Sequence, residues 1–129
     1  NRTHMIRVPG SGRFELRLMD GAVNPYLLQA GIIAAGMDGM KNRRNPGKPI
    51  HINMYEEVHK VKNAKKLPKN LDIALSNLSK SKVMQKAFSQ KTIQSYVKLR
   101  RTEIKQFKKS QDSKKKGITN WEKTNTLDC

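Results

Sequence analysis

Charged side chains that could bind phosphate and a metal ion alternate with apolar ones in segment 13–18. Arg13, Glu15 and Arg17 occupy every second position, and phenylalanine or leucine fills the positions between them. This period of two predicts a β-strand with one apolar face and one face that carries plus, minus and plus charges. Guanidinium groups bind phosphate oxygens, and a carboxylate is a hard oxygen ligand for a divalent cation. The pattern therefore suits polyphosphate and metal chemistry.

A second strand is predicted just before this one. Residues 3–8 also alternate, and the following Pro-Gly-Ser-Gly at 9–12 is typical of a turn. Pairing Val8 with Gly12 around a three-residue loop would place Arg7 beside Arg13, on the face that carries Glu15. The alternative interpretation is a solvated outer face held by cross-strand ion pairs, with no ligand at all.

The remaining elements are predicted to be helical. Asn24 and Pro25 form a strong helix start, and residues 24–37 are apolar on nearly every side, which predicts a buried helix. Helical spacing recurs at 70–79, 82–88 and 92–109, followed by a polar tail, 110–129, that Trp121 is expected to dock. The expected fold class is α+β: a β-hairpin at 1–20, the buried helix, and a mostly helical C-terminal portion at 70–109.

Charge and composition limit the classes of partner. The net charge is +17, of which residues 1–49 contribute +5 (eight basic, three acidic) and residues 50–129 contribute +12 (nineteen basic, seven acidic). Nucleic acid is the default partner for such a charge. The densest stretch, 98–116, has one aromatic residue and no nucleic-acid-binding motif, so a solvated lysine-rich surface is favoured and no specific nucleic acid is expected.

Other features exclude further classes. The longest apolar run is too short to span a bilayer, so no membrane association is expected. One cysteine, Cys129, cannot form an internal disulfide, which agrees with a reducing cytoplasm. Glu56 and His59 share a helical spacing, but an isolated pair favours a surface cluster over a metal site.

Several of these segments together resemble the glutamine synthetase family. The matching segments are N-R-T at 1–3, I-R-V-P at 6–9, R-F-E-L-R-L at 13–18 and N-P-Y-L at 24–27. Their order and spacing match to about residue 40, and weaker similarity continues at 53–55, 67–78 and 121–122. Met19 departs from the family's usual proline. The resemblance implies that residues 1–129 form the C-terminal part of the catalytic domain of such an enzyme.

The resemblance also implies a role for each charged residue of the hairpin. Glu15 matches a ligand of a catalytic Mg²⁺ or Mn²⁺ ion. Arg2 matches an arginine near glutamate and the transferred phosphate, and Arg7 and Arg13 match arginines that contact the nucleotide phosphates. Arg17 matches the arginine associated with the glutamate substrate and its acyl phosphate.

Tyr55 lies where some bacterial members of the family carry a modified tyrosine. Because the flanking glutamates at 56 and 57 depart from the family pattern, an ordinary half-buried tyrosine is favoured there.

The function that the resemblance implies is an ATP-dependent glutamate–ammonia ligase that forms γ-glutamyl phosphate and then glutamine, with ATP and Mg²⁺ or Mn²⁺ as cofactors. A cytoplasmic, ring-shaped homo-oligomer is expected, and this segment alone is expected to be inactive. One alternative is a related γ-glutamyl-amine ligase such as γ-glutamylmethylamide synthetase. Another, of a different class, is a free-standing basic nucleic-acid-binding module.

Overall fold

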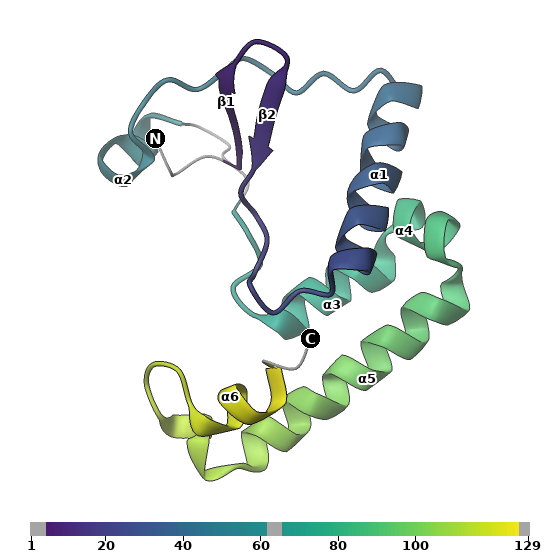
Figure 1. The fold of residues 1–129 in the computed structure, drawn as a ribbon, viewed down its shortest axis with the longest axis vertical. Helices are drawn as coiled ribbons and strands as arrows, with labels where there is room; N and C mark the ends of the chain where they lie inside the picture. Colours follow the sequence, from purple (N-terminus) through teal and green to yellow (C-terminus); the bar gives the residue numbers. More distant parts are fainter. Residues whose placement is uncertain (1–4, 62–65, 127–129) are drawn as a thin grey trace. The chain divides into compact units, whose positions relative to one another are not determined.

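The computed structural model describes residues 5–61 and 66–126 of the chain (Figure 1). It divides into two units. The first comprises Asn1–Val23 and Asn45–Lys66, and the second comprises Asn24–Arg44 and Leu67–Cys129. The first unit holds the only strands among the described residues, and the second unit holds the long helices. The expected α+β class is confirmed. No helix in the described ranges is long and apolar enough to cross a membrane.

The first unit begins with the predicted hairpin. Strand β1 spans Ile6–Gly10 and pairs antiparallel with β2, Arg13–Leu16. Ser11 and Gly12 form the turn, where Gly12 has a φ of 72°, a value that glycine adopts without strain.

The predicted register of this hairpin is wrong. Arg7 lies opposite Glu15 rather than beside Arg13, whose partner is Gly10. The reason is that β1 continues through Pro9 to Gly10, which shortens the loop to two residues and introduces an irregularity between Arg7 and Gly10. The four charged residues still share one face, but their order across the strands differs from the prediction.

Two short helices complete the first unit: α2, Met54–Glu57, and the 3₁₀ helix η1, Val58–Lys60. The side chain of Asn53 caps α2 by accepting a hydrogen bond from the Tyr55 backbone N–H at 3.1 Å. Tyr55 is 80% exposed, so the prediction of a half-buried tyrosine is wrong.

Helix α1, Pro25–Lys41, opens the second unit. Its predicted start is confirmed, since Asn24 Oδ1 accepts a hydrogen bond from the Leu27 N–H at 3.0 Å. The helix runs four residues beyond the predicted end at 37.

The prediction that α1 is buried is not met within this chain, because none of its residues is buried. Within the second unit it packs against α4. Tyr26, Ile33, Met37 and Met40 are 61–81% exposed. These residues lie 7, 4 and 3 positions apart, so they form one apolar face of the helix.

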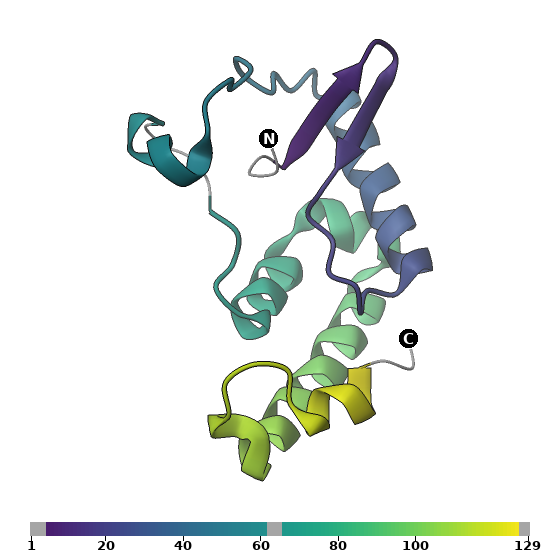
Figure 2. The same cartoon turned by 60° about the vertical axis from the view of Figure 1, so that its left-hand side comes forward.

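Three further helices build the core of the second unit: α3, Leu71–Lys80; α4, Lys82–Phe88; and α5, Gln90–Lys109 (Figure 2). Leu75, Ile93 and Val97 are buried between α3 and α5. The partly buried residues that pack against this core cluster are Leu78, Met84, Phe88, Tyr96 and Ile104. The predicted helices are confirmed to within two residues at each end.

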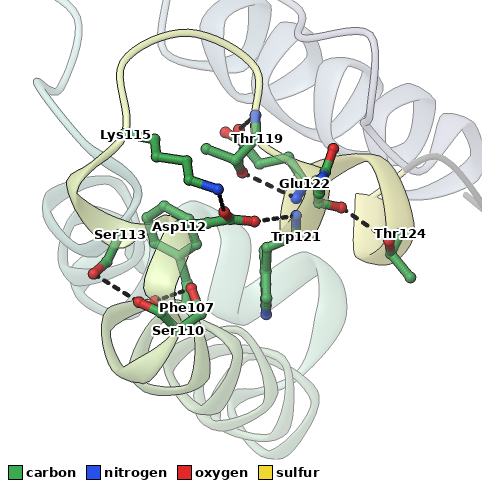
Figure 3. A network of polar contacts seen from close by, with 10 residues as sticks. Phe107, Ser110, Asp112, Ser113, Lys115, Thr119, Trp121, Glu122 and Thr124 are labelled. Carbon is green, nitrogen blue, oxygen red and sulfur yellow. Dashed lines mark hydrogen bonds and ion pairs between the residues drawn. The ribbon is translucent and has the colours of Figure 1, made fainter.

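The tail folds back on the end of α5. It comprises the 3₁₀ helix η2, Gln111–Lys114, and helix α6, Asn120–Thr126. The rings of Trp121 and Phe107 lie 5.2 Å apart between centroids, which confirms that Trp121 docks the tail. Asp112 accepts a hydrogen bond from the Trp121 backbone N–H at 2.8 Å and pairs with Lys115 at 2.6 Å (Figure 3).

A capping box starts α6. Thr119 Oγ1 accepts a hydrogen bond from the Glu122 N–H at 3.2 Å, and Glu122 Oε2 accepts one from the Thr119 N–H at 2.7 Å. The Thr119 backbone and hydroxyl hydrogen bonds lower the pKa of Glu122, and the Lys115 and Trp121 hydrogen bonds lower the pKa of Asp112. Both carboxylates therefore hold the tail in their ionised form.

Replacing Leu75 with alanine should lower the free energy of unfolding by about 2–5 kcal/mol, because the side chain is 2% exposed and its loss leaves a cavity between α3 and α5. Urea unfolding followed by helical circular dichroism measures this. Leu99→Ala is the matched control, since Leu99 on α5 is 57% exposed and should cost about 0.5 kcal/mol or less. Equal costs for the two variants would contradict the assignment of the core.

Candidate functional site: the charged face of the hairpin

The hairpin face is organised around the carboxylate of Glu15, which lies between two arginines. Arg17 Nε donates a hydrogen bond to Glu15 Oε1 at 2.5 Å, and Arg7 Nη1 donates one to Oε2 at 3.2 Å. Each oxygen of the carboxylate therefore takes a different guanidinium group.

Backbone pairing is what brings these three residues together. Opposed residues of an antiparallel pair project to the same face, which places Arg7 over Glu15. Arg17 lies just beyond β2, yet its N–H donates to the Met5 carbonyl at 2.9 Å. This bond extends the ladder by one residue pair and keeps Arg17 on the same side as Glu15.

The two arginines also determine the ionisation of Glu15. The hydrogen bond from Arg17, followed by that from Arg7, lowers the pKa of the Glu15 carboxyl, and these effects outweigh its partial desolvation. The side chain of Arg17 is 24% exposed and that of Arg7 is 47% exposed. The carboxylate is thus negatively charged at neutral pH and remains in contact with solvent.

Arg13 occupies the same face without taking part in this cluster. It is exposed, stands two residues before Glu15 in the strand, and makes no ion pair with any residue that the structure describes. Its guanidinium fork is free for an external anion. Arg2 lies outside the described residues, so the structure brings together Arg7, Glu15 and Arg17, with Arg13 beside them, and does not describe the fifth residue.

The hairpin face supplies one oxygen ligand, the Glu15 carboxylate, for a hard cation. A carboxylate offers about four lone-pair positions, and the two arginines use two of them. No group of three or more His, Cys, Asp or Glu side chains in residues 5–61 and 66–126 could hold a metal ion. Glu15 could therefore bind Mg²⁺ or Mn²⁺ together with ligands from outside these residues.

The double engagement of Glu15 is the feature that sequence reasoning missed. The plus–minus–plus order of charges along the second strand was the signal for this arrangement, but the predicted register placed Arg7 beside Arg13 instead of Glu15. The cross-strand ion pair of the alternative interpretation is present, since Arg7 contacts Glu15 across the ladder. That pair alone does not separate a solvated face from a binding site.

Residues 1–122 match the family described as glutamine synthetase, catalytic domain. Glutamine synthetase of Rhizobium meliloti is 48% identical over 128 residues, which is 99% of this chain and 28% of that protein. Glutamine synthetase of Methanocaldococcus jannaschii is 33% identical over 95% of this chain and 27% of its own length.

A relative named for a different activity is also similar. Glutamate–methylamine ligase of Methyloversatilis universalis is 49% identical over 90 residues, covering 67% of this chain and 20% of that protein. No solved structure matches the chain. The chain spans less than a third of the length of these relatives.

The pKa of Glu15 should be lower than its usual value of 4.5. Because the folded-state pKa lies below the unfolded one, the ion pairs stabilise the hairpin fully above about pH 4.5, and this stabilisation is lost as the pH falls through the lowered pKa. Carboxyl-carbon NMR of the protein labelled at glutamate measures the midpoint. Arg17→Gln should raise it toward 4.5, whereas Arg13→Gln is the control that should change it less. A midpoint at or above 4.5 in the unaltered protein would refute the arrangement.

Proposed function

The chain belongs to the glutamine synthetase family, and on this basis we propose that the protein it belongs to is an ATP-dependent glutamate–ammonia ligase. The observation that carries the proposal is the Glu15 carboxylate held between Arg7 and Arg17 on a face that also presents Arg13. Such a face offers both a hard anionic ligand and guanidinium groups for phosphate.

The proposed reaction has two steps. The γ-carboxylate of glutamate attacks the γ-phosphorus of ATP, and ADP leaves to give γ-glutamyl phosphate. Ammonia then attacks the acyl carbon, phosphate leaves, and glutamine is formed after loss of a proton. Phosphoryl transfer of this kind depends on positioning and on neutralising charge rather than on a covalent protein nucleophile. The hairpin has residues of the required kind, since arginine remains charged and holds its donors in a fixed plane.

Each residue of the hairpin face has a proposed task. Glu15 would bind Mg²⁺ or Mn²⁺, an ion that supplies positive charge to the transferred phosphate. Arg7 and Arg13 would orient the phosphates of ATP, and Arg2 would contact glutamate and the transferred phosphate. Arg17, whose Nε donates to Glu15, would hold the glutamate carboxylate and its acyl phosphate through its planar guanidinium donors.

The proposal requires residues beyond this chain. One carboxylate supplies a single ligand, and the described residues contain no group of three or more His, Cys, Asp or Glu side chains that could hold a metal ion. We therefore infer that this segment acts as one part of a larger active site. On the basis of family membership we also propose that the protein is a homo-oligomer in the cytoplasm. Support for a partnered state comes from the apolar face of α1, which nothing in its unit covers.

A second candidate function is ligation of methylamine to glutamate. It is favoured by the 49% identity to a glutamate–methylamine ligase, although that match covers less of the chain than the match to glutamine synthetase. Both activities share the acyl-phosphate step, so the hairpin serves either one. The family match to a catalytic domain favours both ligases over a free-standing nucleic-acid-binding module.

Glu15→Gln in the intact protein should remove most ligase activity with little change in thermal stability, because the amide keeps the shape of the side chain but loses the charge that binds the cation. Activity is measured as phosphate release at increasing Mg²⁺ concentration. Glu57→Gln is the matched control, since Glu57 pairs with Lys60 on η1, outside the hairpin, and should leave activity unchanged. Full activity of the Glu15 variant at ordinary Mg²⁺ concentration would contradict the metal role.

The acceptor amine should be ammonia. With ammonia and methylamine at equal concentration, glutamine should exceed γ-glutamylmethylamide among the products, as separated by mass spectrometry. An excess of the methylamide would establish the second candidate instead. Control reactions without ATP should form neither product, because both depend on the acyl phosphate.

A further inference from the structure

Helix α5 presents a row of basic side chains along one exposed face. The helix carries seven basic residues and one acidic residue, Glu103. At 3.6 residues per turn, six of the basic residues fall within an arc of about 100° around the helix axis. This set, called the α5 basic row, consists of Lys91, Lys98, Arg101, Lys105, Lys108 and Lys109, all of them exposed.

The core-facing side of α5 fixes the direction of this row. Ile93 and Val97 are buried against Leu75, and Tyr96, Ile104 and Phe107 are partly buried. The helix therefore cannot rotate its basic residues inward without exposing its core side. From Lys91 to Lys109 the row extends for about 27 Å at 1.5 Å per residue, and Lys91, Lys98 and Lys105 recur about every 10.5 Å.

The charges of the row are largely unpaired. Arg101 contacts Asp72 at 3.3 Å, and both side chains are about half exposed. The five lysines of the row make no ion pair with any residue in the described part of the chain. Glu103 lies outside the arc and forms an ion pair with Arg100, with Arg100 Nη1 2.8 Å from Glu103 Oε2. Like charges that are held in a straight row without counter-charges repel one another. Binding of a polyanion would relieve this repulsion and lower the free energy.

We propose that the α5 basic row binds the phosphodiester backbone of double-stranded nucleic acid without regard to sequence. The proposal is separate from the ligase site and does not depend on it. Lysine suits this role because its ammonium group is a point charge on a flexible stem, which can meet phosphates without a fixed fork geometry. Binding would be driven by release of the cations condensed along the duplex.

Two other partners fit the row less well. A docked protein needs an apolar centre in the interface, and the arc contains only basic and polar residues. Single-stranded nucleic acid needs aromatic side chains for base stacking, and the aromatic residues of α5, Tyr96 and Phe107, lie on the core side. Base-specific readout is not expected either, since contacts of lysine to phosphate oxygens carry no sequence information.

The test is the salt dependence of binding by the intact protein to a fluorescently labelled DNA duplex of about 20 base pairs. One variant carries Lys91→Gln, Lys98→Gln and Lys105→Gln, which removes three charges from the row. The matched control carries Lys41→Gln, Lys82→Gln and Lys123→Gln, three exposed lysines on other helices. Retention of the helical circular dichroism signal and of thermal stability shows that both variants are folded.

The proposal predicts that the unaltered protein binds two duplexes of unrelated sequence with affinities within about twofold of each other. The row variant should bind more weakly, and its plot of log affinity against log salt concentration should be less steep by about 2.7, at about 0.9 per phosphate contact. The control variant should keep the steeper slope. Equal losses in both variants, no binding at low salt, or tighter binding of polyglutamate than of the duplex would overturn the proposal.

Discussion

The period of two along β2 is the constraint on which the functional account depends. Because successive side chains of a strand point to opposite faces, Arg13 and Glu15 must share one face once the strand forms. The hydrogen bond from the Arg17 N–H to the Met5 carbonyl keeps Arg17 on that face too. Antiparallel pairing then adds Arg7 to the same face, opposite Glu15. One carboxylate thus stands among three guanidinium groups. This excess of positive charge favours an anionic ligand. When no ligand is bound, the Glu15 carboxylate reduces the repulsion between the arginines.

Local signals explain how much of the fold was predictable from the sequence. The Asn24–Pro25 helix start depends on residues next to the helix it begins, and it appears in the structure where expected. The helical spacing at 70–79, 82–88 and 92–109 likewise depends on residues close in sequence, and these helices form within two residues of the predicted ends. The hairpin register was not predictable in the same way. It depends on whether Pro9 joins the strand or the loop, and a proline at the edge of a two-stranded ladder is compatible with either.

Burial was harder to predict than secondary structure, since it depends on what lies around an element. The apolar sequence of α1 predicted a buried helix, yet the residues of its own unit leave Tyr26, Ile33 and Met40 exposed. The sequence of a helix shows which of its residues are apolar but not which elements cover them, and this chain spans 28% of the length of the Rhizobium meliloti relative. For Tyr55, the neighbouring sequence held no signal of its exposure.

The most direct test of the central claim is the position of the metal ion in crystals of the intact protein grown with Mn²⁺ and ATP, located by anomalous scattering. The account predicts an Mn²⁺ ion at coordination distance from a Glu15 carboxylate oxygen, with ATP phosphate oxygens within hydrogen-bonding distance of Arg7 or Arg13. An ion bound elsewhere, with Glu15 still held by both Arg7 and Arg17 and no phosphate on the hairpin face, would contradict it.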